Sequence, residues 1–485
     1  MKFIKLILIT ALILPLGGCF GSEPNDIAYI VALGFDKSEN NANYKLTIQF
    51  AKPTQISGGA SEEGGKGGPD IIENITVEAP NIYAGINIAN HIVSKKFSLF
   101  HTKLFVFSQE IAQEGVGDLL ETMSRSEEIR PDVYIAVALG TASDYLRAVK
   151  PVVELNPAKY YQLSFDKNDS AGYPRCTLQD FYVLENIDYS DIVVPLAGVI
   201  NSDSSEMKSG EGMSESGNAG ESTKSKSSEN ESGNADINSE NRGNERGINI
   251  SEIPKEQSSE DESGSEQEST GSVGEKNKNN ADAPMNESGF EYKIKNYLAG
   301  QTAVEEENKS EVMGMAVFTK QQMTGVLGGT DSVLYNILNG DYKGSYVTFY
   351  NNKNPENPIT VKIIQIKKPH TSLNIKNKTI DIKLFLESNF YSLSSGYVLE
   401  EDIENFERSA AEEIRKASVN FIKNVRDEYG ADILGLGLKA KRSFLTNQSF
   451  SDYNWRERFK EYDINVNVDF KVRRNGLTLR KAKGE

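Results

Sequence analysis

The distribution of apolar residues over the first 200 positions predicts alternating strands and helices. An apolar run at 27–35 and an alternating pattern at 44–50 predict two strands, and the polar segment 36–43 between them predicts a hairpin turn. Further predicted strands cover 71–77, 103–108, 132–139 and 192–200, and predicted helices cover 80–93, 110–125, 144–149 and most of 160–184. The run at 132–139 is typical of a strand covered on both faces. This alternation predicts a layered domain in which helices pack on a sheet.

Beyond residue 310 the pattern predicts a second group of strands and a long helix. The helix covers 401–429, its apolar residues recur every three or four positions from Ile403, and Gly430 follows as a C-cap. Predicted strands cover 312–318, 344–350, 361–367, 379–386 and 464–472, and a short helix covers 332–338. The long helix can bury its apolar face against a sheet made from these strands. The predicted fold class is therefore α+β.

The segment 201–289 separates these two regions and differs from both in composition. It is rich in Ser, Glu, Asn, Gly and Lys and contains no Leu, Phe, Tyr, Trp or Cys. Such a segment buries too little apolar surface to offset the entropy of ordering its backbone, about 1–2 kcal/mol per residue. We predict a disordered low-complexity insert and interpret it as a solvated tether, with an acidic binding arm as the less favoured alternative.

The net charge and the number of cysteines argue against several kinds of partner and site. The net charge is −17, which argues against binding nucleic acid or anionic headgroups through bulk electrostatics. Cys19 and Cys176 are the two cysteines of the sequence, so neither a disulfide framework nor a CxxC metal site is predicted. Cys176 is interpreted as a buried or idle thiol rather than a reactive one.

The sequence contains no pattern that predicts a catalytic, cofactor or metal site. His91, His101 and His370 lack metal-ligand spacing, and no GxSxG motif occurs. The glycine-rich segments 325–330 and 435–437 lack the further residues of a phosphate or nucleotide motif, so both are predicted as turns. Asp188 and Asp191 could form an acid–base pair, but a solvated loop is the favoured interpretation. An exported hydrolase is a third, weaker possibility.

The N-terminus carries the pattern of a lipoprotein signal peptide. Lys2 and Lys5 precede an apolar run at 6–14, and the sequence Leu16-Gly17-Gly18-Cys19 follows. The apolar run is shorter than the ~20 residues that a membrane-spanning helix needs. We expect cleavage after residue 18 and attachment of diacylglycerol to the thiol of Cys19. The mature chain would then be tethered outside a membrane by its N-terminus.

Four stretches together resemble the Ger(x)C family of spore-germination lipoproteins. The first is Ala32-Leu33-Gly34-Phe35-Asp36-Lys37 with the preceding segment 25–28, and the second is the strand–helix unit 101–112 with Gly115 and Arg130-Pro131. The third is Gly314-Met315-Ala316-Val317-Phe318 with Gly325. The fourth joins Ile433-Leu434-Gly435-Leu436-Gly437, Trp455-Arg456-Glu457-Arg458-Phe459 and Arg473-Arg474-Asn475-Gly476. The chain lacks the family's usual Trp-Asp pair after the lipidated cysteine, and the insert is atypical.

The resemblance implies three α+β domains, each a mostly antiparallel sheet packed with helices, and no known enzymatic activity. The expected divisions are a signal peptide at 1–18, domains at 19–200, 290–357 and 358–485, and the insert at 201–289. It also implies two integral-membrane partners, an A-type subunit and a transporter-like B-type subunit of a nutrient germinant receptor. The expected location is the outer face of the spore inner membrane.

The leading hypothesis is a non-catalytic, lipid-anchored receptor subunit that acts by protein–protein contact and binds no nucleic acid. The alternative is a lipid-anchored solute-binding protein that delivers small molecules to a transporter. Trp455, the single tryptophan, is interpreted as a core anchor, with a partner contact as the less favoured role.

Overall fold

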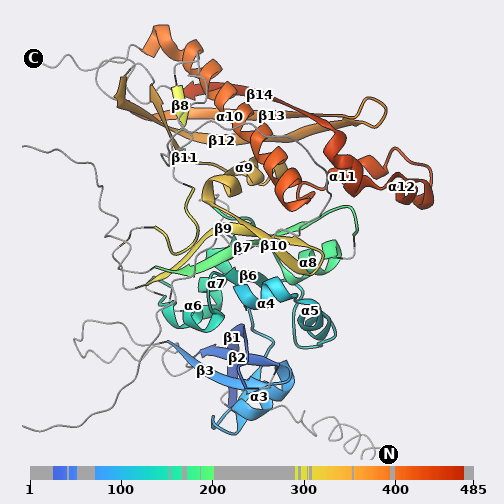
Figure 1. Cartoon of the computed structure of the whole chain (residues 1–485). Helices are drawn as coiled ribbons and strands as arrows, with labels where there is room; N and C mark the ends of the chain where they lie inside the picture. Colours follow the sequence, from blue (N-terminus) through green and yellow to red (C-terminus); the bar gives the residue numbers. More distant parts are fainter. Residues whose placement is uncertain are drawn as a thin grey trace, which may run out of the picture. The chain divides into compact units, whose positions relative to one another are not determined.

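The computed structural model describes most of the chain outside the N-terminus and the insert (Figure 1). The described residues are 26–40, 43–51, 71–151, 153–154, 156–166, 172–185, 187–200, 290–292, 296–302, 304, 308–351, 354–393 and 399–474. The predicted signal peptide at 1–18 and the whole insert at 201–289 therefore lie outside the described residues. In the described part, no helix is both long enough and apolar enough to cross a membrane.

The first sheet has nine strands in the described residues, in the order β10-β9-β7-β6-β5-β1-β2-β3, with β4 paired to β1. β1 (Ile27–Lys37) and β2 (Tyr44–Ala51) form the predicted hairpin. The remaining strands are β3 (Ile72–Ala79), β4 (Lys96–Ser98), β5 (Leu104–Ser108), β6 (Tyr134–Ala138), β7 (Ile192–Val199), β9 (Ser310–Thr319) and β10 (Gln322–Leu327). β1, β5, β6 and β7 are parallel neighbours, whereas β9 pairs antiparallel with β7. The sheet thus contains strands from both sides of the insert.

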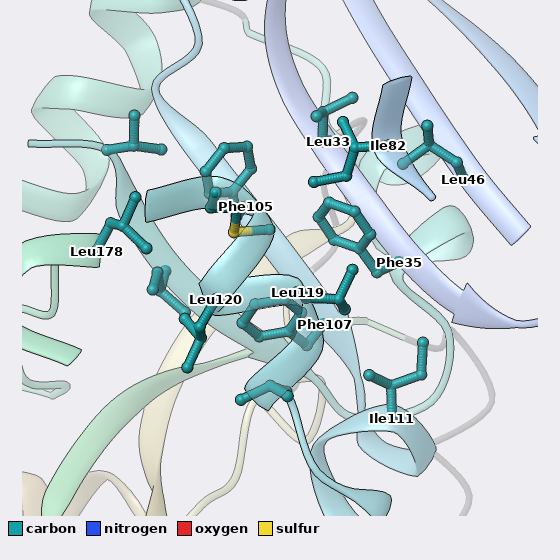
Figure 2. Close-up of a cluster of buried hydrophobic side chains, with 14 of the residues drawn as sticks. Leu33, Phe35, Leu46, Ile82, Phe105, Phe107, Ile111, Leu119, Leu120 and Leu178 are labelled. Atoms are coloured by element: carbon teal, nitrogen blue, oxygen red, sulfur yellow. The ribbon is translucent and has the colours of Figure 1, made fainter. Parts of the chain in front are cut away.

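Helices cover both faces of this sheet. On β5, Phe105 and Phe107 point into a core shared with α3 (Ile82–Asn90), α4 (Gln109–Glu114), α5 (Gly117–Ser124) and α8 (Leu178–Glu185). Figure 2 shows this core, with Phe35, Leu119 and Leu178 around the two rings. Leu104 and Val106 point into the opposite core with α6 (Ala142–Ala148) and α7 (Pro157–Asp166), because successive strand residues face opposite sides. The prediction of a doubly covered strand at 132–139 is confirmed by β6, which is buried throughout.

The predicted helix at 110–125 is wrong, because α4 and α5 are separate. Gly115 has φ 125°, outside the helical region, and ends α4. The amide of Val116 then donates to the carbonyl of Gln321, in the turn between β9 and β10, at 2.9 Å. A tertiary contact therefore replaces the helical hydrogen bond. The mostly helical segment predicted at 160–184 is likewise divided into α7 and α8, and between them Cys176 accepts a hydrogen bond from Ile135 of β6.

The second sheet has the order β14-β13-β12-β11-β8 in the described residues. Its strands are β8 (Phe290–Tyr292), β11 (Ser345–Asn351), β12 (Asn354–Asn374), β13 (Thr379–Leu393) and β14 (Asp463–Arg474), and all neighbours are antiparallel except β13 and β14. β12 and β13 extend beyond the predicted 361–367 and 379–386 because they pair with each other up to Asn374 and Thr379. The polar sequence of β12 after residue 366 has no apolar alternation that could predict this extension.

The long helix α10 (Leu399–Tyr429) packs on this sheet as predicted. The ring of Phe406 is fully buried and contacts the rings of Phe349 and Phe390, each with centroids 5.3 Å away. α9 (Gly329–Asn339) contributes Ile337 to the same core. The predicted α+β fold class is confirmed. The number of domains and the boundaries 19–200, 290–357 and 358–485 stay predictions.

Candidate functional site

The residues first considered for chemistry are spread over the fold. Cys19 lies outside the described residues. His101 packs edge-on against the ring of Tyr29 at 4.7 Å, and His91 is exposed after α3. Within the described residues, no group of three His, Cys, Asp or Glu side chains could hold a metal ion. Cys176 is buried, and burial raises the pKa of its thiol well above the usual value, so its interpretation as a buried thiol is confirmed.

Asp191 is the best organised of these residues. Its side chain is buried, and Arg456 binds both carboxylate oxygens, with Nη2 at 2.8 Å from Oδ1 and Nη1 at 3.2 Å from Oδ2. The predicted solvated loop is therefore wrong for Asp191. Asp188 is exposed and contributes its backbone carbonyl, which accepts from Arg456 Nε at 3.2 Å. The two aspartates do not form an acid–base pair.

Asp432 continues the network from the opposite side. Its backbone amide donates to Asp191 Oδ2 at 2.7 Å, and its carbonyl accepts from the Asp191 amide at 2.9 Å. Its carboxylate accepts from the amides of Leu436 and Gly437, at 2.9 and 2.6 Å, and from Trp455 Nε1 at 3.1 Å. We call Asp191, Asp432, Trp455 and Arg456 the junction network. It joins the start of β7 in the first sheet to the helical segment that precedes β14 in the second.

Burial raises the pKa of the Asp432 carboxyl from 3.8 to about 6. The hydrogen bonds from Gly437, Leu436 and Trp455 act in the opposite direction, and the charge of Asp191 raises the pKa further. None of the groups that lower this pKa is a cation. For the Asp432 carboxyl, the desolvation that penalises its charge outweighs the three hydrogen bonds, so the net change in pKa is upward.

Two predictions for the C-terminal segment have opposite outcomes. The turn predicted at 435–437 is wrong, because Gly435 caps α11 (Leu436–Lys441) and Gly437 belongs to the helix. A Cβ at Gly437 would lie 2.3 Å from the Tyr189 carbonyl oxygen and 2.7 Å from the Trp455 ring, so a side chain does not fit. Trp455 is buried and stacks on Phe459 with centroids 5.3 Å apart, so its interpretation as a core anchor is confirmed.

The turn predicted at 325–330 is also wrong. β10 ends at Leu327, and α9 begins at Gly329 with Gly328 as its N-cap residue. The carboxylate of Asp331 accepts from the amide of Gly328, which is the reciprocal contact of a capping box. An acidic residue three positions after the cap is a sequence signal for a helix start, and here it identifies α9.

Asp36 has a structural role that the sequence did not reveal. Its buried carboxylate accepts from the amides of Ala142 and Ser143, at 2.6 and 3.0 Å, at the start of α6. Burial raises its pKa, against these hydrogen bonds. The partner amides are more than 100 positions away along the chain, so no local pattern could identify the contact.

A pocket of about 520 Å³ lies beside the junction network. Its lining includes Cys176, Asp180, Tyr335, Lys439 and Arg442. Burial and the nearby charge of Arg442 lower the pKa of Lys439. Among the described residues, neither Lys439 nor Arg442 forms a salt bridge.

Two family models match the chain on either side of the insert. One, described as the spore germination protein N-terminal domain, matches residues 21–199. The other, described as spore germination B3/GerAC-like, C-terminal, matches residues 313–476. The chain belongs to the Ger(x)C family of spore germination proteins. The resemblance drawn from the four sequence stretches is therefore confirmed, and the C-terminal match contains Asp432, Trp455 and Arg456.

A Ger(x)C relative is spore germination protein KC of Bacillus subtilis (strain 168), which is 28% identical over 163 residues. The aligned segment covers 33% of this chain, and the chain spans 39% of the length of that relative. The crystal structure of the GerBC protein aligns with a TM-score of 0.45 and 11% identity, covering 91% of this chain and 96% of GerBC.

Proposed function

We propose that this Ger(x)C protein is a non-catalytic, lipid-anchored C subunit of a spore germinant receptor. The observation that carries the proposal is the pair of family matches at 21–199 and 313–476. The sequence Leu16-Gly17-Gly18-Cys19 supports the anchor, because a short apolar run followed by small residues and a cysteine is typical of lipoprotein signals. The anchor would place the protein on the outer face of the spore inner membrane.

The proposed partners are two integral-membrane subunits, one A-type and one transporter-like B-type. The junction network supports a role in protein–protein contact. Its two buried carboxylates bind backbone amides, Trp455 and Arg456 within the chain, so they hold segments of the chain together. We expect a partner to contact surfaces of the chain outside these internal hydrogen bonds.

Substitution of the lipidated cysteine tests the anchor. Cys19→Ala removes the thiol that would carry the lipid, so we expect the protein to leave the membrane fraction and germination in nutrient to slow. Cys176→Ala is the matched control, because that thiol is buried in the core and should not affect membrane retention. Unchanged membrane retention and a normal germinant response of Cys19→Ala would contradict the proposal.

Co-purification tests the complex. The protein is tagged at its C-terminus, spore inner membranes are solubilised gently, and the proteins that co-purify are identified by mass spectrometry. We expect two polytopic subunits in constant proportion. Recovery of the protein alone from membranes would agree with the lipid anchor but contradict the proposed receptor complex.

The pocket of about 520 Å³ favours one second candidate, a lipid-anchored solute-binding protein. Lys439 and Arg442 could bind the carboxylate or phosphate of a small solute there. A saturable thermal shift with amino acids or sugar phosphates, lost in Lys439→Gln, would support this function. Flat titrations against both classes would exclude it.

A further inference from the structure

The residues around the start of β1 form one corner of the first sheet. β4 pairs in parallel with the first three residues of β1, from Ile27 to Tyr29. The turn that follows β4 carries Phe100 and His101, and the ring of His101 packs on Tyr29. α3 ends beside β4, because the side chain of Asn90 accepts from the amide of Phe97 at 2.9 Å. Figure 1 shows α3 next to β1, β2 and β3 at the bottom of the view.

Three large apolar side chains are exposed at this corner. Ile88 is 41% exposed, Ile92 is 66% exposed and Phe100 is 56% exposed. We call these three residues the apolar corner. Large apolar side chains gathered on a surface mark a contact with a partner or a membrane more often than isolated ones do.

The backbone holds the apolar corner outward. The amide of Ile92 donates to the carbonyl of Ala89 at 3.0 Å, and the amide of Thr102 donates to the carbonyl of Leu99 at 3.0 Å. Phe97 and Leu99, on either side of Ser98, are buried in the core. The exposed Phe100 side chain therefore follows a segment whose own apolar side chains are packed in the core.

The length of chain between Cys19 and β1 places this corner near the proposed lipid. Ile27 follows Cys19 by eight positions. A fully extended chain spans at most about 3.6 Å per residue, so the two residues are at most about 29 Å apart. The first residues of β1, and β4 paired with them, therefore start close to the bilayer that would hold the lipid.

The chemistry of the corner fits the interfacial region of a bilayer. Ile92 and Phe100 offer apolar side chains, and Lys96, also exposed, offers a cation to lipid phosphates. The acidic groups nearby are Asp26, at the start of β1, and Glu128, whose carboxylate accepts from the amide of Leu99 at 3.2 Å. Since the net charge of the chain is −17, apolar insertion rather than electrostatic adsorption must drive the contact.

We propose that the apolar corner inserts into the interface of the bilayer that carries the lipid of Cys19. This inference rests on the proposed lipid anchor and adds a second contact, which fixes the orientation of the first sheet. β1 then leads away from the membrane for 11 residues, or about 36 Å. The carboxyl ends of the parallel strands β1, β5 and β6 face away from the bilayer, where partner surfaces can reach them.

Depth-dependent quenching tests this contact on the full lipidated chain. A fluorophore sensitive to polarity is attached through Ile92→Cys or Phe100→Cys, and the protein is reconstituted into vesicles of phosphatidylcholine and phosphatidylglycerol without other proteins. Cys176 is buried and Cys19 carries the lipid, so the introduced thiol is the reactive one. Leu445→Cys is the matched control, because Leu445 is 103% exposed and lies in the C-terminal half of the chain.

We expect blue-shifted emission, and quenching by lipids with a spin label on the acyl chain, at positions 92 and 100 but not at 445. With the probe at Ile88→Cys, the double substitution I92S/F100S should reduce quenching to the level of Leu445→Cys, while the far-UV circular dichroism stays unchanged. If the protein floats with the vesicles but the probe gives equal, water-like emission at all positions, the proposed insertion of the apolar corner is wrong and the proposed lipid anchor is retained. If the protein does not float with the vesicles, both the insertion of the apolar corner and the lipid anchor are wrong.

Discussion

At the scale of single residues, the carboxylates of Asp432 and Asp191 accept most of the hydrogen bonds in the junction network. Each carboxylate is buried, but their partners differ: Arg456 neutralises Asp191, whereas three neutral donors bind Asp432. The difference has two measurable consequences, one in the pH dependence of stability and one in the cost of removing a partner.

The first consequence is a loss of stability with rising pH. The pKa of Asp432 is 3.8 in the unfolded chain and about 6 in the folded one. Between these values the folded state binds more protons, so the free energy of unfolding falls as the pH rises from about 4 to about 6, by about 3 kcal/mol from this group. In Asp432→Asn this decline should be absent from the pH profile measured by urea unfolding. Asp188→Asn, at an exposed site, should keep it, and identical profiles for wild type and Asp432→Asn would contradict the assignment.

The second consequence concerns Arg456. Arg456→Ala leaves the carboxylate of Asp191 buried without its cation, which typically costs about 3–5 kcal/mol. We expect a loss of about 3 kcal/mol in urea unfolding, because Arg456 itself is partly exposed. Arg125→Ala is the control: its salt bridge with Glu121 is exposed on both sides, so the loss should stay below about 1 kcal/mol. Equal losses in the two variants would mean that the buried pair does not hold the junction.

At the scale of elements, the short helix α11 depends on close packing as well as on hydrogen bonds. Gly437 lies against Tyr189 and Trp455, so the start of α11 can approach the segment before β7 only without a side chain at this position. Gly430, which ends α10, differs because it has φ 61° but open space around its Cβ position. Substitution of Gly437 therefore measures the steric cost of a side chain, and substitution of Gly430 measures the conformational cost of a positive φ.

Gly437→Ala should destabilise the protein by about 2–3 kcal/mol, because backbone and indole must move to admit a methyl group. Gly430→Ala should cost about 1–2 kcal/mol, the price of placing a side chain in the left-handed region. The free energy of urea unfolding measures both. Quenching of the Trp455 fluorescence by acrylamide gives a second readout: it should increase in Gly437→Ala and stay unchanged in Gly430→Ala. A smaller loss for Gly437→Ala than for Gly430→Ala would contradict the steric argument.

The elements also show which features the sequence could predict. α10 repeats its apolar positions over 31 residues, and its position was predicted to within two residues. The helix predicted at 110–125 has the same kind of pattern but divides at Gly115, because Val116 bonds to the turn after β9. The periodicity of apolar residues indicates which face of a helix is buried. It does not indicate where a backbone amide donates to a carbonyl that is distant in the sequence instead of to one in the same helix.

At the scale of the whole molecule, β7 and β9 pair across the insert. The nine-stranded sheet is therefore closed by a connection that includes the segment 201–289, which has no large apolar residue other than Ile, Val and Met. The entropy of closing a loop grows only slowly with its length. The sheet should thus tolerate a much shorter connection.

Replacing residues 208–285 by a Gly-Ser linker tests this expectation. We expect unchanged far-UV circular dichroism and a free energy of unfolding within about 1 kcal/mol of the wild-type value, because the loop-length term is small. Replacement by a shuffled sequence of the same composition and length is the control. A large loss in the linker variant with none in the shuffled one would show that the connection needs its length, and a loss in both would show that its sequence contributes to the fold.

The fold class, most element positions and the family could be predicted from the sequence alone. Local spacing specifies which residues share a face, and the order of short motifs such as 433–437 and 455–459 is a property of the chain alone. The three-dimensional structure was needed to show that Asp191 is buried against Arg456, that Asp36 binds the start of α6, and that Ile92 and Phe100 are exposed. These contacts join residues that are distant in the sequence, and burial depends on what the rest of the fold places around a side chain.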